Sequence, residues 1–480
     1  MSRTRSFGLA LAGAGFLAAA PAVARADEDP VLQERIQALE AQVQELRQQL
    51  GRRPAAEESL SAQVDRYLQE QEKGSLWVDR SGKPLQKVVD SIYPTMWLRA
   101  RPTWSDNYFD QEDDVDDEGP FTLFRGRIGL GANLKGGVGM YMEFDAAGSW
   151  GNTATVFVND TPTTPTLQQA YVTGLYSKQL RFDTKVGRFE MQFGDEYVMG
   201  VTDFAQASVY HDGVMLSRDY AKQGFKFDFW ATKVVDGSKN PLTPTPDDSV
   251  YMAGIYGNWY GGQAKTKLPG TLEPYYIMVW DARETPGAVT PGVSGPKDIH
   301  TSGLRWYHDM ATKDKAGLGW NLNGNVQYQD ELKWSTDSRV TYSLPTVKYR
   351  PKVFGQFAYA SGDHDDPGYN PLFQDGHARF GWADFFSFTN IAIFGGGVHF
   401  TPMENWTVGG EGRSIHQARE TTVLAKKNIA WEADLVVQHK HSDNVSMEFA
   451  YSLILFRDVD LATGPADNVQ RAYLQVVVSF

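Results

Sequence analysis

The sequence predicts an all-β membrane protein: a transmembrane antiparallel β-barrel of about 18 strands, preceded by a short periplasmic α-helical coiled coil. Three observations support this fold class. Apolar and polar residues alternate along many strand-length segments, short and long connections alternate between these segments, and a heptad pattern of apolar residues precedes them all. A soluble β-sandwich also contains alternating strands, so the two faces of each strand must distinguish these folds.

Residues 1–26 have the features of a secretory signal peptide. Arg3 and Arg5 precede the apolar stretch FGLALAGAGFLAAAPAV, and an A-x-A cleavage sequence ends at Ala26. An inner-membrane anchor is the alternative interpretation of this stretch. Cleavage would remove three arginines and no acidic residue, which makes the net charge of −13 more negative. This charge argues against nucleic acid as a partner, because proteins that bind nucleic acids present basic surfaces.

Residues 27–53 predict a coiled-coil helix. Apolar residues follow one another at spacings of 4, 3, 4, 3 and 4, at Leu32, Ile36, Leu39, Val43, Leu46 and Leu50. This is the a/d seam of a coiled coil, and we expect it to join chains into a homo-oligomer. A lone amphipathic helix packed on its own protein is the alternative. Residues 54–90 are expected to form a periplasmic linker that contains a short helix.

Residues 91–480 are expected to form the barrel, because their alternating segments are oily on one face and charged on the other. Ile128 and Leu130, for example, share a face, whereas Arg125 and Arg127 share the opposite face. The oily faces of such segments carry no charge, as lipid contact requires, since Lys or Arg at the bilayer midplane costs about 2–4 kcal/mol. The dry core of a sandwich would reject the charges on the opposite faces.

The connections between these segments support closure into a barrel. If the C-terminus lies in the periplasm, short turns such as 440–444 and 400–404 alternate with long links such as 361–390. Counting backwards gives eighteen strands, the first at about 92–105. An even number places both ends on one side, and a barrel of this size leaves an aqueous channel.

The chain ends on Phe480, at the lipid face of the expected closing strand. Terminal aromatic strands of this kind resemble the recognition signal of bacterial outer-membrane barrels. We therefore expect the protein in the bacterial outer membrane, with its N-terminal helix in the periplasm and outer-membrane lipid as one partner.

Two segments resemble the alginate-export family of outer-membrane barrels. One is 170–214, with V-G-R, G-D and D-G-V; the other is 359–391, with S-G-D, N-P-L-F and G-H. The resemblance implies an outer-membrane β-barrel, eighteen-stranded in the best-known member of the family. It also implies passage of an anionic polysaccharide through a pore lined by arginine and lysine.

Two features depart from that family. A coiled coil resembles instead the trimeric porins, including phosphate-selective ones, and the acidic net charge argues against alginate itself. Three functions therefore stay open: export of a secreted polysaccharide, a trimeric diffusion porin for small solutes or anions, and a structural tether between the outer membrane and the cell wall.

Strand parity assigns the charged residues that would line the pore. The basic ones are Arg99, Arg101, Arg125, Arg127, Arg181, Lys185, Arg305, Arg339, Arg350, Lys352, Arg413 and Arg471; the acidic ones are Glu143, Asp145, Glu432, Asp434 and Glu448. Arg188 matches a pore arginine of the family, but it would face inward only if a bulge follows Gly187.

The first four arginines are expected to share one water-filled sector of the lumen and to attract anions. The alternative is that the lumen charges simply pair with one another.

No cofactor and no enzymatic activity are expected. The acidic run at 110–119 could bind Ca²⁺ through Asp113, Asp114, Asp116 and Asp117, but a run of like charges is more often a solvated loop. No G-x-S-x-G, H-E-x-x-H, Walker or G-x-G-x-x-G sequence is present. A barrel lipase or deacylase is the alternative, because its residues need not be contiguous in sequence.

Overall fold

The computed structural model describes residues 88–108, 119–150, 165–175, 182–206, 208–235, 250–260, 269–281, 298–362, 368–420, 427–457 and 466–480. The expected signal peptide, the coiled coil and nearly all of the linker lie outside these residues. So do Arg181 and the acidic residues Asp113, Asp114, Asp116 and Asp117. No helix in the described part of the chain is both long and apolar enough to cross a membrane.

The described residues form eighteen strands. They are β1 (Val89–Asp106), β2 (Gly119–Leu134), β3 (Val138–Trp150), β4 (Thr166–Thr173), β5 (Asp183–Phe189), β6 (His211–Tyr220), β7 (Phe225–Val235), β8 (Val250–Trp259), β9 (Thr271–Asp281), β10 (Asp298–Asp309), β11 (Gly317–Gln329), β12 (Glu331–Ser343), β13 (Lys352–Ala360), β14 (Ile391–Phe400), β15 (Trp406–Gln417), β16 (Asn428–Lys440), β17 (Val445–Phe456) and β18 (Val469–Ser479).

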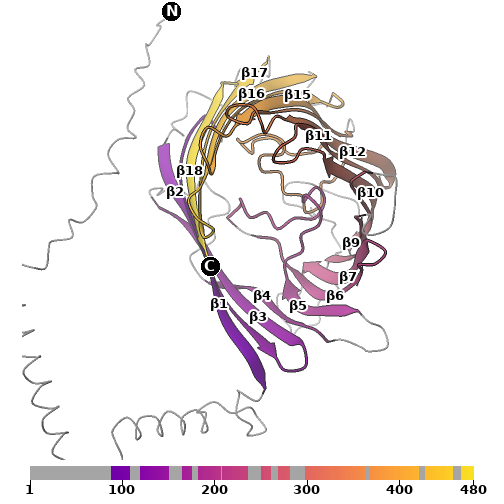
Figure 1. Ribbon diagram of the computed structural model, residues 1–480. Helices are drawn as coiled ribbons and strands as arrows, with labels where there is room; N and C mark the ends of the chain where they lie inside the picture. Colours follow the sequence, from indigo (N-terminus) through magenta and orange to yellow (C-terminus); the bar gives the residue numbers. More distant parts are fainter. Residues whose placement is uncertain are drawn as a thin grey trace, which may run out of the picture. The chain divides into compact units, whose positions relative to one another are not determined.

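These strands close into one antiparallel barrel (Figure 1). Each strand pairs with the next along the chain, and β1 pairs with both β2 and β18. Phe480 extends the closing ladder, because its N–H donates to the Met96 carbonyl at 2.9 Å and its own carbonyl accepts from the Met96 N–H at 3.0 Å. The predicted closed barrel of eighteen strands is confirmed.

Alternation along each strand separates a lipid-facing surface from the lumen. On β2, Ile128 and Leu130 are 65% and 58% exposed, whereas Arg125 and Arg127, on the opposite face of the strand, are buried. The pattern arises because successive side chains of a strand point to opposite faces.

Two long links fold into the barrel instead of remaining outside it (Figure 1). We call residues 190–206 and 208–210, between β5 and β6, the first inward segment, and residues 361–362 and 368–390, between β13 and β14, the second inward segment. They pair with each other: Met199 and Phe373 form a parallel bridge, and the Gly200 N–H donates to the Phe373 carbonyl at 2.7 Å.

The inward segments bring an apolar core into the lumen. Met199 and Leu372 pack in one cluster with wall residues such as Trp230, Ile277 and Ile393, all of them fully buried. A barrel of this size can hold an open aqueous channel. Here the two segments lie within that space, so their side chains contribute to the lining of the lumen.

Candidate functional site in the barrel lumen

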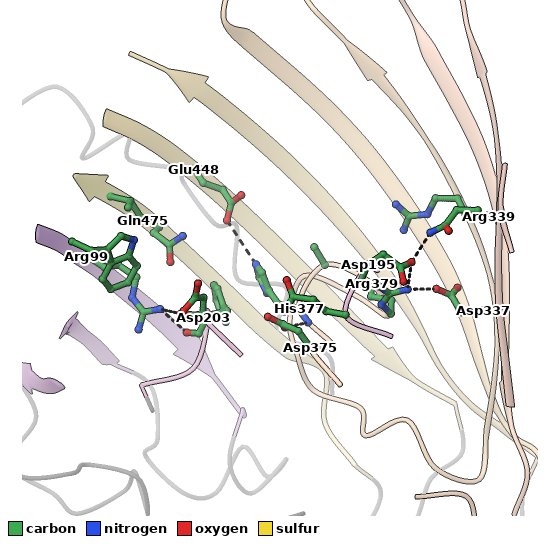
Figure 2. A pocket seen from close by; sticks show the side chains of 16 residues that line it. Arg99, Asp195, Asp203, Asp337, Arg339, Asp375, His377, Arg379, Glu448 and Gln475 are labelled. Carbon is green, nitrogen blue, oxygen red and sulfur yellow. Dashed lines mark hydrogen bonds and ion pairs between the residues drawn. The ribbon is translucent and has the colours of Figure 1, made fainter. Parts of the chain in front are cut away.

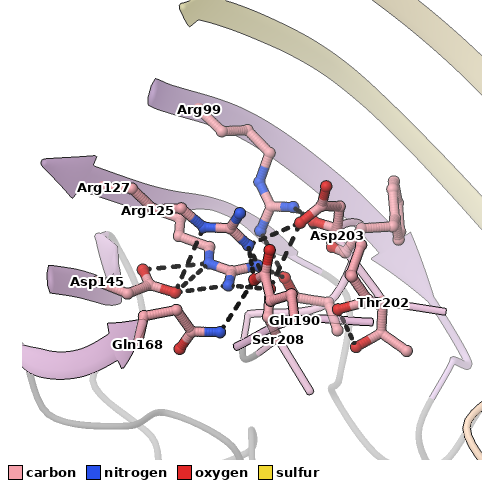
Figure 3. A network of polar contacts seen from close by, with 12 residues as sticks. Arg99, Arg125, Arg127, Asp145, Gln168, Glu190, Thr202, Asp203 and Ser208 are labelled. Atoms are coloured by element: carbon pink, nitrogen blue, oxygen red, sulfur yellow. Dashed lines mark hydrogen bonds and ion pairs between the residues drawn. The ribbon is translucent and has the colours of Figure 1, made fainter. Parts of the chain in front are cut away.

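Arg125 and Arg127 of β2 form a buried network of ion pairs (Figure 3). The Arg125 guanidinium contacts the Asp145 carboxylate through two nitrogens, with Nε–Oδ2 at 2.9 Å and NH2–Oδ2 at 2.5 Å. Arg127 donates to the Asp203 carboxylate at 2.6 Å and lies 3.4 Å from Glu190. The charge-assisted contacts of Arg127 fix the first inward segment to the wall, whereas the Arg125–Asp145 pair joins β2 to β3.

Arg99 and Arg101 of β1 hold the same segment through its backbone. Arg99 donates to the carbonyls of Asp203 at 2.5 Å and Phe204 at 2.8 Å. Arg101 donates to the Phe204 carbonyl at 2.9 Å, and its guanidinium carbon lies 3.7 Å from the centre of the Phe204 ring. Such a stack adds a cation–π attraction to the hydrogen bond.

The four arginines thus come together, as their parity predicts, but the expectation that they project into open water is wrong. Each is between 1% and 7% exposed, because the first inward segment covers them. A long link with its own carbonyls and carboxylates satisfies the guanidinium groups better than a wide, empty lumen would.

On the opposite side, Asp195 joins the two inward segments to the wall. Its carboxylate lies 3.1 Å from Arg379 of the second segment and 3.4 Å from Arg305 of β10. Burial would raise the pKa of Asp195, but the guanidinium groups of Arg379 and Arg305 outweigh it and hold this pKa at about 2. Asp195 is therefore charged at any physiological pH. Arg379 also pairs with Asp337 at 2.6 Å.

A cavity of about 570 Å³ lies between these two anchor points (Figure 2). Trp97 and Phe204 contribute aromatic rings to its lining. Among the described residues that line it, carboxylates outnumber guanidinium groups: Asp195, Glu196, Asp203, Asp337, Asp375 and Glu448 against Arg99, Arg339 and Arg379. We call this space the lower cavity.

A second cavity, of about 460 Å³, lies farther along the strands toward the long connections. We call it the upper cavity. On β1 the lower cavity touches Trp97 and Arg99, whereas the upper cavity touches Arg101. On β18 the lower cavity touches Gln475, and the upper cavity touches Arg471.

Phe204, Asp375 and His377 border both cavities, so the two spaces adjoin at these side chains. The rings of Phe204 and His377 are stacked, with centroids 3.4 Å apart. His377 Nδ1 lies 2.7 Å from Asp384, and its Nε2 lies 3.7 Å from Glu448. Burial lowers the pKa of His377, but the nearby Asp384 and Glu448 carboxylates outweigh it, so this pKa lies above its ordinary value.

The family model described as alginate export matches residues 151–456. The chain belongs to the alginate export family. The match covers both inward segments and most of the barrel wall, so family membership and fold together make this chain a bacterial outer-membrane β-barrel channel. No curated protein matches the chain.

Solved structures similar to this alginate export family member are barrels as well. The crystal structure of Pseudomonas aeruginosa OccK11 (OpdR) gives a TM-score of 0.54 at 12% identity, covering 82% of this chain and 98% of that chain. Pseudomonas aeruginosa OpdK with vanillate gives 0.56 at 10% identity, with 82% and 99% covered. OccK2 (OpdF) of the same organism, in complex with glucuronate, gives 0.55 at 12% identity, with 82% and 100% covered. At these identities the likeness concerns the fold.

Most of the other charged residues predicted to line the pore of this family member also contact polar groups or aromatic rings inside the barrel. Arg413 lies 2.5 Å from Asp434, Arg305 lies 2.8 Å from Glu273, and Arg471 donates to the Tyr108 hydroxyl at 3.0 Å. The remaining contacts are Glu143 with Tyr141, Glu432 with the Ala383 N–H, Glu448 with Tyr473, Lys185 with the Tyr171 ring and Arg339 with the Phe354 ring.

Two predicted wall residues lie near the short-turn end. Arg350 is in the turn between β12 and β13, where it is exposed, and Lys352 is the first residue of β13. Both line a small cavity at that end of the barrel.

Arg188 does not face the lumen as the family resemblance implies. The ladders of β5 with β4 and β6 run without a shift in register, so the bulge expected after Gly187 is absent. Arg188 therefore follows strict alternation, on the face opposite Lys185 and Phe189, and pairs with Asp212 at 2.7 Å. The shift in this region lies in β4 instead, where Gln168 is the extra residue.

Parity did not single out the residues that constrict the lumen, because Asp195, Phe204, His377 and Arg379 lie in links rather than strands. The signal that could have found them is their position: all four belong to the two segments that carry the family motifs.

Proposed function

We propose that this alginate export family member is a passive channel for small polar solutes, and that its path runs through the lower and upper cavities. The observation that carries the proposal is their arrangement: two cavities, both lined by charged and aromatic side chains, meet at the Phe204–His377 contact. Separation of these two rings would join the cavities into one passage along the barrel.

The size and lining of the lower cavity favour solutes no larger than a mono- or disaccharide. Its volume of about 570 Å³ lies within the range of small-molecule sites. Trp97 and Phe204 offer ring faces, and the excess of carboxylates disfavours simple anions. We therefore propose neutral or positively charged hydroxylated solutes as the preferred class, with Arg99, Arg339 and Arg379 as hydrogen-bond donors to them.

Liposome swelling with the purified full-length protein tests this proposal. Glucose, glucosamine and glucuronate have similar sizes and differ in charge, and vanillate and glucuronate are the compounds named with the similar barrels OpdK and OccK2. We expect glucosamine and glucose to enter faster than glucuronate, and rates to fall with sugar length. Fastest entry of glucuronate, or no entry of any solute, would contradict the proposal.

Export of an anionic polysaccharide is the second candidate, and the family match over residues 151–456 favours it. A polymer would require the inward segments to move away from the wall. Uronate oligomers of increasing length distinguish the two candidates: a polysaccharide exporter should pass long oligomers about as readily as short ones, whereas a small-solute channel should exclude them.

For the N-terminal residues the proposal rests on the sequence pattern. We propose that residues 27–53 form a periplasmic coiled coil that joins chains into a homo-oligomer. Replacing Ile36, Leu39, Val43 and Leu46 with polar residues should then weaken cross-linking between chains. Deleting residues 31–73 tests the tether alternative, which requires blebbing membranes with unchanged conductance.

A further inference from the structure

Three polar side chains on the outer face of the barrel form a hydrogen-bonded chain. Ser414 Oγ lies 2.7 Å from His416 Nε2, and His416 Nδ1 lies 2.6 Å from Asn428 Oδ1. Ser414 and His416 are two residues apart on β15, so they point the same way, and a shift in register between β15 and β16 places Asn428 opposite His416. Backbone geometry therefore brings the three groups together.

The partners decide which nitrogen of His416 carries the proton. An amide oxygen can only accept a hydrogen bond, so Nδ1 must donate to Asn428. In the neutral ring Nε2 is then an acceptor, and the Ser414 hydroxyl donates to it. This is the order of groups in a serine hydrolase: a nucleophile bonded to a base, and the base oriented by a third group.

The chain of bonds faces the membrane, not the lumen. The β15 residues that alternate with it, Arg413 and Ile415, are buried inside the barrel. Ser414 lies opposite two exposed aromatic residues, Phe394 on β14 and Trp431 on β16.

The site also lies near the rim of the barrel. His416 is the residue before the last of β15, and Asn428 is the first of β16. The long link that joins these strands is expected at the extracellular side, where the headgroups of the outer leaflet meet its acyl chains.

A strip without side chains runs from Ser414 toward the middle of the membrane. The next two outward positions of β15 are Gly412 and Gly410. A Cβ at Gly410 would meet nothing within 4 Å, and one at Gly412 would meet only the Glu432 carbonyl, at 3.9 Å. Exposed Leu435 of the neighbouring strand offers an apolar edge, so an acyl chain can lie in this strip beside the hydroxyl.

A cation lies at the headgroup end. The guanidinium carbon of Arg457 is 5.7 Å from the centre of the Trp431 ring, and the backbone N–H of Arg457 donates to the Ile429 carbonyl at 2.9 Å. An exposed arginine at this level suits the phosphate of a lipid headgroup.

We propose that Ser414, His416 and Asn428 form a second functional site, an esterase that hydrolyses acyl esters of lipids in the outer leaflet. Ser414 Oγ attacks the ester carbonyl carbon, and its proton moves to His416 Nε2. The ester C–O bond breaks, the leaving alkoxide takes the proton from His416, and the acyl group stays on Ser414. Water then loses a proton to His416 and attacks the acyl-serine. The bond between Ser414 Oγ and the acyl carbon breaks, Oγ takes the proton back from His416, and the fatty acid leaves. Asn428 acts as a positioning residue that holds the ring.

Labelling of the full-length protein in detergent micelles with a fluorophosphonate tests for an activated serine. We expect one labelled serine, Ser414, with labelling abolished in Ser414→Ala and reduced roughly 100-fold or more in His416→Phe, because general-base assistance contributes about 10²–10⁴-fold. Asn428→Ala should reduce labelling, and Asn428→Asp, which keeps the acceptor, should restore most of it.

The matched control is Ser338→Ala on β12. Ser338 occupies an outward position as well, but its hydroxyl lies 3.3 Å from Thr336 rather than next to a histidine. Its labelling should equal that of the wild type. Conductance and heat-resistant migration on gels should be unchanged in every variant, which excludes misfolding as the cause of a loss.

Release of fatty acid identifies the substrate. Vesicles of phosphatidylglycerol and phosphatidylethanolamine supply phospholipid esters, and vesicles containing lipopolysaccharide supply the acyl esters of lipid A. Release of fatty acid from either kind of vesicle supports the proposal if it depends on Ser414, and the kind of vesicle identifies the lipid that is hydrolysed. Absence of release from both vesicles, or a fluorophosphonate label that persists in Ser414→Ala, overturns it.

Discussion

The ring of Phe204 lies flat against the imidazole of His377, with centroids 3.4 Å apart and ring planes at 7°. One ring belongs to each inward segment, and both rings border the lower and the upper cavity. Arg101 covers Phe204 at 3.7 Å, and the Tyr473 hydroxyl lies 3.3 Å from His377 Nε2. The contact is therefore supported from two strands of the wall, β1 and β18.

Phe204→Ala should open the passage. Removing the ring leaves a gap between the cavities, so we expect a larger single-channel conductance and faster liposome swelling. Phe229→Ala, at an exposed position on β7, is the control and should change neither quantity. A conductance equal to the wild type in Phe204→Ala would mean that solutes take another route.

Acid pH should stabilise the closed contact. The pKa of His377 is raised above its ordinary value of about 6.5 by Asp384 and Glu448, against the effect of burial. Stabilisation from such a group is fully present below the unfolded pKa and is lost as pH rises through the raised pKa. We expect open events in planar bilayers to become more frequent as pH rises above about 6.5.

His377→Gln tests the origin of that pH dependence. It keeps a hydrogen-bonding side chain but has no proton to lose, so the pH profile should flatten. His441→Gln, in the turn before β17, should keep the wild-type profile. An unchanged profile in His377→Gln would assign the effect to other groups.

Removing either member of the Arg125–Asp145 pair should destabilise the barrel, because the other member is then a buried charge without its ion-pair partner. Arg125→Met leaves a buried carboxylate without its main partner, and removal of one member of a buried ion pair costs about 3–5 kcal/mol. The double replacement Arg125→Met with Asp145→Leu should recover much of this loss. Denaturant unfolding of the folded barrel measures both.

Lys226→Met is the control for this cycle. Lys226 lies 3.2 Å from Asp228, but its side chain is 45% exposed, so the change should cost about 1 kcal/mol or less. If Arg125→Met costs no more than Lys226→Met, the Arg125–Asp145 pair in Figure 3 does not stabilise the barrel.

The lower cavity should prefer cations at low salt. Its described lining has more carboxylates than guanidinium groups, and charges act over about 10 Å at 0.1 M salt but only about 3 Å at 1 M. Reversal potentials should therefore show a cation preference that molar salt removes. Glu196→Gln with Asp375→Asn should reduce it, whereas Asp443→Asn in an exposed turn should not. Anion preference in the wild type would indicate instead that the arginines on β1 and β2 determine the charge selectivity.

Deletion of Phe480 should impair assembly without changing conductance. The deletion removes an exposed aromatic side chain and two backbone hydrogen bonds to Met96 of β1. We expect less folded protein in the outer membrane and normal currents from each channel that does assemble. Phe480→Tyr, which keeps the ring and the backbone bonds, should assemble normally, and wild-type surface amounts of the deletion variant would contradict the expectation.

The faces of the strands could be predicted because they depend only on local geometry. Alternation along β2 separates Ile128 from Arg127 whatever the rest of the chain does. The same rule placed Arg188 on the outer face, and the expectation of a bulge, drawn from the family resemblance, was wrong. At this position the periodicity of the residues was the better guide.

The sequence by itself determined an eighteen-stranded barrel, its two faces, and a ring of charged side chains that point inward. Tertiary structure alone decided what those charges meet. Met199 pairs with Phe373, and Arg99 with Asp203 and Phe204, across more than a hundred residues each. His416 faces Asn428 only because the register shifts between two strands. The physical reason is that alternation follows from the geometry of a single strand, whereas folding of a link into the lumen depends on buried area and charge pairing between distant segments.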